Sequence, residues 1–403
     1  MLSAPLDSCK KLKSFYRVSK SILIIAAEAS STPYAEQVIE HLKKLDPNLK
    51  FFGIGSMSME KKGFECLGYA EDLAVVGFLE VVKHYSKIKS VFDIVVAQAN
   101  QRKPAVVLVL DYPGFNLRLA EKLQPQGHRI FYYISPQVWA WKQNRIFTIK
   151  KYIEKVFLIF PFERDFYIKH NAAYEFVGHP LLDDLKPDFF NMQKVNLRRQ
   201  KYGIKNTDPV LLLMPGSRKS EIERHFQLQL DSAAVLLKKY PQMRLLIAGA
   251  PTLSREYLIE QMGDFKSPFI LLHETPNEMI SLADIVLASS GTATLMVALL
   301  EKPMVIMYKV NWLSGVIGRM LTKKNLPFFG LPNLILKERV VAELLQKEVT
   351  QSRIVFELEK LMDDRYRQKV ITDLKRIRIL LGDSGASKRV ADHLWQIIKN
   401  SGA

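Results

Sequence analysis

Two short segments of the sequence contain the residue types that hold a phosphate group. Each follows an apolar run and precedes a helical pattern, and each consists of glycine with small hydroxyl residues or arginine. Glycine permits a tight turn, and amide N–H groups at the start of a helix attract an anion. The candidate binding residues are Gly216, Ser217 and Arg218 in the first segment and Ser290, Gly291 and Thr292 in the second. Either segment alone could be an ordinary turn, but the two together predict a nucleotide site.

Apolar runs of strand length alternate with helical patterns along most of the chain, which predicts parallel sheets with helices on both faces. The runs cover 21–27, 51–54, 105–110, 129–134, 156–160 and 175–177 in the first half, and 210–214, 244–248, 269–272, 285–288 and 304–308 in the second. The hydrophobic signal weakens between 183 and 208, and 352–400 is helical in period. We therefore predict an α/β protein of two Rossmann-like, doubly wound domains that face a cleft, with a helical C-terminal tail. In such sheets, ligands bind beyond the carboxyl ends of the strands.

The composition is that of a globular protein with a strong positive charge. The 403 residues are 48% hydrophobic, and 58 Lys and Arg against 41 Asp and Glu leave a formal net charge of +17. This charge suits nucleic acid, an anionic membrane surface or a phosphorylated substrate, and alone it does not choose among them. The two cysteines provide neither a disulfide framework nor a metal site, so a reducing cytoplasm is expected. Neither an RNA-binding signature nor a Gly-x-Gly-x-x-Gly turn is present, so neither nucleic acid nor a nicotinamide cofactor is predicted.

An ordered set of sequence motifs extends along nearly the whole chain. The most specific one is the stretch 135–145, Ser-Pro-Gln-Val-Trp-Ala-Trp-Lys-Gln-Asn-Arg. The others are 160–163 (Phe-Pro-Phe-Glu), 177–180 (Val-Gly-His-Pro), 215–218 (Pro-Gly-Ser-Arg), 290–295 (Ser-Gly-Thr-Ala-Thr-Leu), 331–334 (Leu-Pro-Asn-Leu) and 343–346 (Glu-Leu-Leu-Gln). Together these motifs resemble the lipid-A-disaccharide synthases, a family of inverting glycosyltransferases of Gram-negative envelope synthesis with the two-domain architecture called GT-B.

The resemblance implies a reaction between two lipid-linked sugars. A 2,3-diacylglucosamine unit would pass from its UDP carrier to the 6-hydroxyl of 2,3-diacylglucosamine 1-phosphate, giving a β-1,6 disaccharide and UDP, with no metal and no cofactor. A base must take the proton of the attacking hydroxyl. The candidate is Asp111, because 111–116 (Asp-Tyr-Pro-Gly-Phe-Asn) resembles the family's Asp-x-Pro-x-Phe-Asn. Without the resemblance, Asp111 could equally cap a helix that begins near Phe115.

The resemblance also assigns binding roles to other residues. Arg218 would contact the diphosphate beside the amides of Gly216 and Ser217, and Ser290, Gly291 and Thr292 would hold a second part of the UDP. Asn333 and Gln346 match family positions around the nucleotide, although ordinary helix and turn roles are nearly as compatible with the sequence alone. Acceptor binding is assigned to Glu28 and Ser30.

The sequence departs from the family pattern in two of these places. Residues 27–32 read Ala-Glu-Ala-Ser-Ser-Thr where the family has Gly-Glu-Ala-Ser-Gly-Asp, and Met296 stands where the family has a Glu. A thioether accepts hydrogen bonds only weakly, so ribose contacts of the donor would change. The alternative function is therefore a diverged paralogue that binds a UDP-sugar with altered donor specificity or without turnover.

The apolar segment 73–82 is followed by Lys83, Lys87 and Lys89. An apolar face flanked by lysines is typical of a helix that rests in a headgroup layer, whereas the alternative is a buried helix with a solvated lysine edge. The acylated substrates that the resemblance implies favour the first interpretation. Contacts with the inner-membrane surface are therefore predicted for Val75, Val76, Phe78, Leu79 and Val82. These contacts predict a cytoplasmic protein that is peripheral on the inner membrane. The sequence is also compatible with a homodimer.

These considerations divide the chain into four predicted parts. Residues 1–20 lack the apolar core of a secretory signal and form a basic N-terminal extension. Residues 21–190 form an acceptor- and membrane-facing Rossmann-like domain, and 200–350 form a UDP-sugar-binding Rossmann-like domain. Residues 351–403 form C-terminal helices that could pack back on the N-terminal domain.

Overall fold

The computed structural model describes residues 20–28, 30–73, 78–309 and 328–400. The chain forms two compact units, each with its own hydrophobic core. The first unit comprises Met1–Ile159, Glu163–Val177 and Gly385–Ala403, and the second comprises Phe160–Phe162 and Gly178–Ser384. No helix among the described residues is both long enough and apolar enough to span a bilayer.

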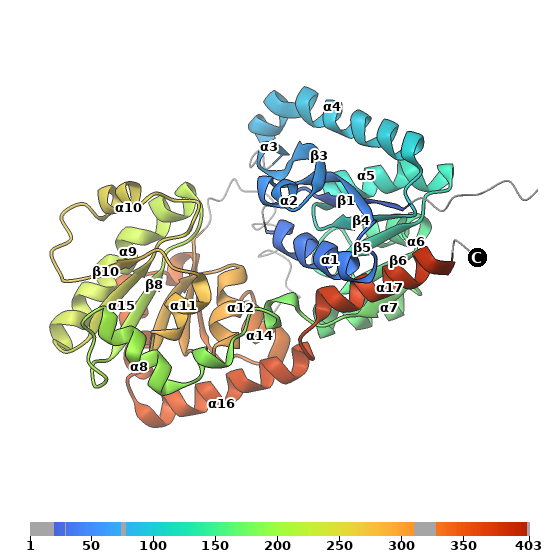
Figure 1. The fold of residues 1–403 in the computed structure, drawn as a ribbon. Helices are drawn as coiled ribbons and strands as arrows, with labels where there is room; N and C mark the ends of the chain where they lie inside the picture. Colours follow the sequence, from blue (N-terminus) through green and yellow to red (C-terminus); the bar gives the residue numbers. More distant parts are fainter. Residues whose placement is uncertain (1–19, 29, 74–77, 310–327, 401–403) are drawn as a thin grey trace, which may run out of the picture. The chain divides into compact units, whose positions relative to one another are not determined.

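The first unit contains a parallel sheet with the strand order β3-β2-β1-β4-β5-β6-β7 (Figure 1). Strands β1 and β4 lie side by side at its centre, with Ala26 opposite Leu110 in the register. Both strands are almost completely buried, as expected for parallel strands that are covered on both faces. The strands are β1 (Ser21–Ala26), β2 (Lys50–Gly55), β3 (Phe64–Tyr69), β4 (Val106–Leu110), β5 (Ile130–Tyr133), β6 (Lys155–Leu158) and β7 (Tyr174–Phe176).

Helices that follow these strands cover the two faces of the first sheet. They are α1 (Thr32–Leu45), α2 (Met57–Lys61), α3 (Ala70–Leu73), α4 (Phe78–Arg102), α5 (Pro113–Leu123), α6 (Arg145–Tyr152) and α7 (Arg164–Lys169). The C-terminal helix α17 (Ala386–Asn400) belongs to this unit and lies beside α1 (Figure 1). Its Ser387 Oγ donates to Gln37 Oε1 at 2.8 Å, and Arg389 Nε donates to the carbonyl of Val177 at 2.9 Å. Hydrogen bonds therefore attach the end of the chain to the first core.

The second unit contains a parallel sheet with the order β10-β9-β8-β11-β12-β13. This is the strand order of a Rossmann fold, in which the order reverses between the first and fourth strands. The strands are β8 (Val210–Met214), β9 (Arg244–Ala248), β10 (Ile270–Leu272), β11 (Ile285–Ser289), β12 (Met304–Tyr308) and β13 (Ala342–Leu345). The helices are α8 (Met192–Lys201), α9 (Lys219–Lys239), α10 (Arg255–Met262), α11 (Pro276–Ser281), α12 (Thr292–Leu299), α14 (Leu331–Leu336), α15 (Gln351–Lys360) and α16 (Asp364–Leu381).

The predicted fold class is confirmed, since both halves contain a doubly wound parallel sheet and the chain ends in helices. The second unit starts earlier than the weak hydrophobic signal suggests. Leu181 and Leu182 are buried in its core, so the chain changes units at Gly178. The C-terminal helices divide between the units, because Leu358 of α15 and Leu374 of α16 pack in the second core whereas α17 packs in the first unit.

Candidate active site

The two glycine-containing segments of the second unit lie next to each other. Strands β8 and β11 are parallel neighbours, with Met214 opposite Ala288, so both carboxyl ends reach the same edge of the sheet. Ser289 Oγ donates to the carbonyl of Pro215 at 2.8 Å and joins the two turns directly. The sheet order reverses at this pair of strands, which is the position where open α/β sheets bind ligands.

The turn after β8 already binds an anionic group of the protein itself. Glu221 Oε2 accepts hydrogen bonds from the amides of Ser217 at 2.8 Å and Arg218 at 3.3 Å. Gly216 has φ +130°, and a Cβ built there would lie 2.6 Å from the Cβ of Glu221. Glycine is thus required both by the backbone conformation and by the close approach. The amides at the start of α9 form an anion site that the Glu221 carboxylate occupies.

The Arg218 side chain is available to a ligand at the same turn. It is 65% exposed, and its Nη1 lies 3.9 Å from Glu221 Oε1, which is a long contact for an ion pair. A guanidinium in this position could transfer to a diphosphate, because it presents several donors in a planar fork.

The turn after β11 opens α12 at the same edge. Gly291 and Thr292 are exposed and Ser290 is half-buried. The Ser290 amide donates to the carbonyl of Met307 at 3.0 Å, so this turn is anchored to β12. Met296 lies one turn into α12, half-buried against the core. It therefore lies on the same helical face as Thr292.

A buried histidine fastens this part of the second unit, and no sequence pattern indicated it. His225 of α9 is 1% exposed, and its Nδ1 lies 3.2 Å from Ser289 Oγ. On its other side, Nε2 lies 3.0 Å from the backbone nitrogen of Lys309. Burial lowers the pKa of His225, which favours the neutral ring. His225 thus ties α9 to the ends of β11 and β12, and it positions both candidate turns.

Asn333 and Gln346, the two remaining nucleotide candidates, differ in accessibility. Asn333 is fully buried. Its Nδ2 donates to the Val341 carbonyl and to Glu343, while its Oδ1 accepts from the amides of Val340 and Val341. All its hydrogen-bonding groups therefore face the protein. Gln346 is half-buried directly after β13, at the same sheet edge as the two turns, with a left-handed φ of +48°.

In the first unit, Asp111 lies at the corresponding reversal of strand order. It follows β4, the parallel neighbour of β1. Asp111 and Tyr112 are both left-handed, with φ +45° and +43°. Two consecutive non-glycine residues in this region are strained, and such strain concentrates at functional sites. Helix α5 begins at Pro113 with Tyr112 as its N-cap, without a side-chain cap, so the alternative role of Asp111 as a helix cap is wrong.

Neighbouring side chains hold Asp111 in this conformation. The hydroxyl of Tyr132 donates to the Asp111 carbonyl, and Asn116 Nδ2 donates to it at 2.6 Å. Asn116 Nδ2 also donates to the Leu110 carbonyl at 2.9 Å. Burial raises the pKa of the Asp111 carboxyl, although a hydrogen bond from the Tyr112 amide opposes the change. A carboxylate with a raised pKa is a stronger base, as proton abstraction near neutral pH requires.

The acceptor candidates Glu28 and Ser30 lie in the turn after β1, beside the end of β4. Ser31 closes this turn, since its amide and its Oγ both donate to the Glu28 carbonyl, at 2.9 and 2.8 Å. Glu28 is half-buried and Ser30 is exposed. Burial and the charge of Glu28 raise the pKa of Tyr112. The structure thus brings Glu28 and the Asp111–Tyr112 pair to one edge of the first sheet.

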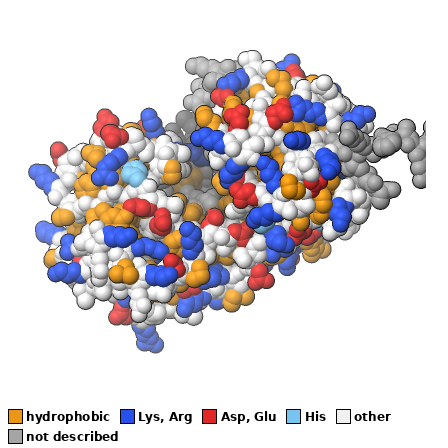
Figure 2. Space-filling model, viewed as in Figure 1, with side chains coloured by type: hydrophobic (Ala, Val, Ile, Leu, Met, Phe, Trp, Pro, Cys, Tyr) orange, Lys and Arg blue, Asp and Glu red, His pale blue; other side chains and the backbone are white. Residues whose placement is uncertain are grey.

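The predicted membrane contacts fall at the limit of the described residues. Val75 and Val76 lie outside them, and Phe78, Leu79 and Val82 lie in the first turns of α4, where the described structure does not include their side chains. On the face of the molecule shown in Figure 2, Lys and Arg side chains are dispersed among Asp and Glu. The net charge therefore does not gather into one continuous patch on this face.

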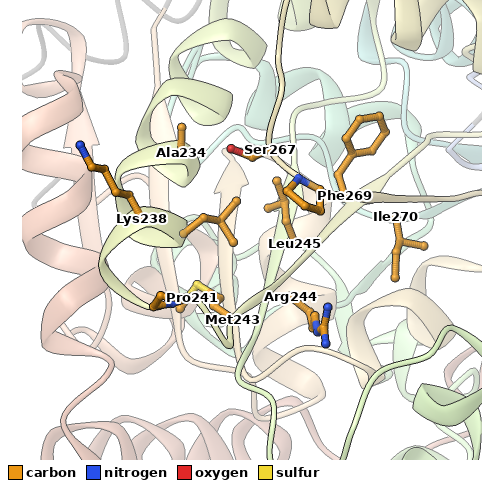
Figure 3. A pocket seen from close by; sticks show the side chains of 11 residues that line it. Ala234, Lys238, Pro241, Met243, Arg244, Leu245, Ser267, Phe269 and Ile270 are labelled. Atoms are coloured by element: carbon orange, nitrogen blue, oxygen red, sulfur yellow. The ribbon is translucent and has the colours of Figure 1, made fainter.

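A cavity of about 360 Å³ in the second unit lies away from these residues (Figure 3). It is lined by Lys238 of α9, by Arg244 and Leu245 at the start of β9, and by Phe269 and Ile270 where β10 begins. Strands β9 and β10 begin at this edge, whereas the candidate turns follow the ends of β8 and β11. The cavity in Figure 3 is therefore not part of the candidate site.

Each unit is a doubly wound sheet whose candidate residues lie at the carboxyl ends of the strands, where open α/β sheets bind ligands, and the two units together are an architecture that two-domain glycosyltransferases share. The family described as lipid-A-disaccharide synthetase matches residues 22–396. The curated lipid-A-disaccharide synthase of Anaeromyxobacter dehalogenans is 33% identical over 393 residues, covering 95% of this chain and 99% of that protein. The chain belongs to the lipid-A-disaccharide synthase family and is a glycosyltransferase.

Solved structures with low sequence identity share the fold. The UDP-GlcNAc 2-epimerase of Neisseria meningitidis, bound to UDP-GlcNAc, has a TM-score of 0.61 at 14% identity and covers 93% of this chain and 100% of its own. Acinetobacter baumannii MurG has a TM-score of 0.57 at 14% identity and covers 93% of this chain and 99% of its own. Because an epimerase shares the architecture, the fold alone does not specify the reaction.

Proposed function

We propose that this protein transfers 2,3-diacylglucosamine from UDP to the 6-hydroxyl of 2,3-diacylglucosamine 1-phosphate. The products are the β-1,6 lipid A disaccharide 1-phosphate and UDP. Family membership supports the reaction class. The single structural observation that carries the assignment of roles is Asp111, a strained carboxylate with a raised pKa at the strand-order reversal of the first sheet.

On the acceptor side, Asp111 acts as the general base. Its carboxylate takes the proton of the 6-hydroxyl while that oxygen attacks the anomeric carbon of the donor. The bond from this carbon to the diphosphate oxygen breaks on the opposite face, which inverts the configuration. Tyr132 and Asn116 keep Asp111 in the left-handed conformation through its carbonyl. Glu28 and Ser30 bind acceptor groups beside it.

On the donor side, the second unit stabilises the departing diphosphate. The amides of Ser217 and Arg218 and the Arg218 guanidinium supply donors and positive charge where negative charge develops. Ser290, Gly291 and Thr292 bind a second part of the UDP, and Gln346 lies at the same sheet edge. Asn333 supports this edge from inside the protein. The Glu221 carboxylate must give up the two amides when a diphosphate binds.

The proposal includes the cytoplasmic surface of the inner membrane, since both substrates carry acyl chains. The apolar segment with Val75, Val76, Phe78, Leu79 and Val82 is the proposed contact, and its flanking lysines favour anionic lipids. A homodimer stays a prediction on which no step of the reaction depends.

A second candidate is a diverged paralogue with altered donor specificity or without turnover, and Met296 favours it. Its thioether stands where the family has a Glu, in the helix that follows the second turn. Restored or increased turnover in Met296→Glu would show that the protein is an enzyme whose turnover Met296 lowers. UDP binding without product in both proteins would identify a protein that has lost turnover.

The deciding experiment is mass spectrometry of the products formed from both lipid substrates. The wild-type protein should form the disaccharide 1-phosphate. Asp111→Asn should reduce kcat by about 10²- to 10⁴-fold, the usual contribution of a general base. Replacing the exposed Asp264 by Asn provides a matched control and should leave the rate unchanged. Full activity of Asp111→Asn, or no product from the wild-type protein, would contradict the proposal.

A further inference from the structure

A cavity of about 560 Å³ lies between α4 and α5 in the first unit. Its walls are mostly apolar, formed by Ile88 and Phe92 of α4 and by Tyr112 and Phe115 at the start of α5. The rings of Phe92 and Phe115 meet edge to face, with their centroids 5.3 Å apart. The volume and the apolar lining are typical of a small-molecule site.

The cavity adjoins the candidate base. Tyr112, which lines it, directly follows Asp111 and shares its left-handed conformation. The Tyr112 hydroxyl donates to the Leu73 carbonyl at 3.2 Å, so the ring is held at the side of the cavity. A molecule in the cavity would therefore touch the residue that directly follows the candidate base.

Two cations stand at the cavity, Lys89 of α4 and Arg118 of α5, and both side chains are exposed. Within the described part of the chain, neither forms an ion pair, and Asp93 is the single carboxylate in the lining. An apolar cavity with cations at its edge complements a molecule that joins a hydrocarbon chain to an anionic group. A nucleotide base would instead need several inward-facing polar partners.

We propose that this cavity binds one acyl chain of the acceptor, with Arg118 and Lys89 at the acceptor's phosphate. The inference rests on the proposed function and names the part of the chain that recognises the lipid portion of that substrate. The acyl chain in the cavity holds the acceptor sugar beside Asp111. The site selects acceptors by chain length, because each buried methylene adds about fourfold to the affinity.

Gly114 allows the cavity to be filled with little disturbance. It lies in the first turn of α5 and lines the cavity, and a Cβ built there meets nothing within 4 Å. Leucine at this position should occupy the space proposed for the acyl chain. Ile88→Trp fills the cavity from α4 and serves as a second, independent variant.

The test compares binding and turnover for acceptors with long and with acetyl chains. Calorimetry with diacylglucosamine 1-phosphate should show at least tenfold weaker binding of the long-chain acceptor to Gly114→Leu and to Ile88→Trp. The acetyl acceptor should bind them as it binds the wild-type protein. Arg118→Gln should weaken both acceptors equally, whereas Lys122→Gln, an exposed cation one turn further along α5 and outside the lining, should weaken neither.

The outcomes separate this inference from the transfer reaction. If both filled variants bind the long-chain acceptor like the wild-type protein, the cavity is not an acyl site. If Gly114→Leu instead loses binding to phospholipid vesicles without acceptor, the cavity holds a membrane lipid and the inference is overturned. If the wild-type protein forms no disaccharide but its chain-length dependence disappears in Gly114→Leu, the acyl site stands and the proposed reaction fails.

Discussion

The side-chain amide of Asn333 donates a hydrogen bond to the Glu343 carboxylate, with 2.7 Å between Nδ2 and Oε1. This bond joins α14 to β13 and so links two separate motifs of the sequence. The same carboxylate accepts from the amides of Phe329 at 2.9 Å and Gly330 at 2.9 Å. Burial raises the pKa of Glu343, although these hydrogen bonds oppose the change. Gln346 follows β13 directly, so the Asn333–Glu343 pair supports the strand end on which Gln346 lies.

Replacing Asn333 by Ala should lower the free energy of unfolding by about 1–3 kcal/mol, because the buried carboxylate and two backbone amides lose their partner. Urea unfolding would measure the change. The exposed Asn144, which makes no side-chain cap, provides a control that should change stability little. An Asn333→Ala protein with unchanged stability and weaker UDP binding would instead indicate direct nucleotide contact.

Glu221→Gln should strengthen UDP binding. The carboxamide keeps an acceptor oxygen near the amides of Ser217 and Arg218 but removes the negative charge that a diphosphate must displace. The gain should be roughly two- to fivefold, as for one partly exposed charge pair. Calorimetric titration with UDP would test this, with the exposed Glu223→Gln on the same helix as control. Weaker binding in Glu221→Gln would mean that the carboxylate is needed to shape the turn.

Arg218→Gln should lower kcat/KM by about 10²-fold, because the departing diphosphate loses a cationic donor. Arg224 lies in α9, the helix that begins directly after Arg218, and it is exposed, so Arg224→Gln is the matched control for loss of one positive charge. Steady-state kinetics with varied donor would measure both variants. Equal losses in the two variants would point to a general charge effect rather than to contact by Arg218.

The raised pKa of Asp111 predicts opposite effects on activity and stability. The base must be ionised, so activity should fall as the pH drops through its folded-state pKa, which lies above that of an ordinary Asp. The effect on stability has the opposite sign. The contribution of Asp111 to the free energy of unfolding is complete below the unfolded-state pKa and is lost as the pH rises through the folded-state pKa. Asp111→Asn should therefore have the strongly reduced kcat predicted above and yet be more stable than the wild-type protein at neutral pH.

Unfolding measured across the acidic range checks this prediction. The stability difference between the two proteins should shrink as the pH falls toward the ordinary pKa of an Asp. A difference that grows with acidity would show that the folded protein stabilises the ionised form of Asp111.

Tyr132→Phe should impair turnover through the position of Asp111, since the Tyr132 hydroxyl donates to the Asp111 carbonyl. We expect kcat to fall more than acceptor KM changes, and stability to fall by about 1 kcal/mol. The adjacent Tyr133 is a close control. Its hydroxyl lies 3.1 Å from Ser387 Oγ of α17 instead, so Tyr133→Phe should leave kcat nearly unchanged. Equal kcat values in the two variants would contradict the proposed role of Tyr132 in positioning Asp111.

Most strands were recognisable in the sequence because parallel strands buried on both faces read as uninterrupted apolar runs. Strands β4 and β8 are examples, with every residue buried. Strands β3 and β13 were not predicted. Both are edge strands. Only the first residue of β3 is buried, and β13 is four residues long with the buried carboxylate of Glu343 inside it, so neither presents an apolar run.

The sequence by itself determined the fold class, the family and the residue types at the ends of the strands, because these depend on local composition and on motif order. Only the tertiary structure decided which groups meet. The hydrogen bond from Ser289 to Pro215 follows from the strand order that makes β8 and β11 neighbours. The occupation of the Ser217 amide by Glu221 follows from a side-chain conformation, as does the inward orientation of Asn333. Such contacts depend on packing between segments and on rotamers, and a linear pattern of residues encodes neither in a readable form.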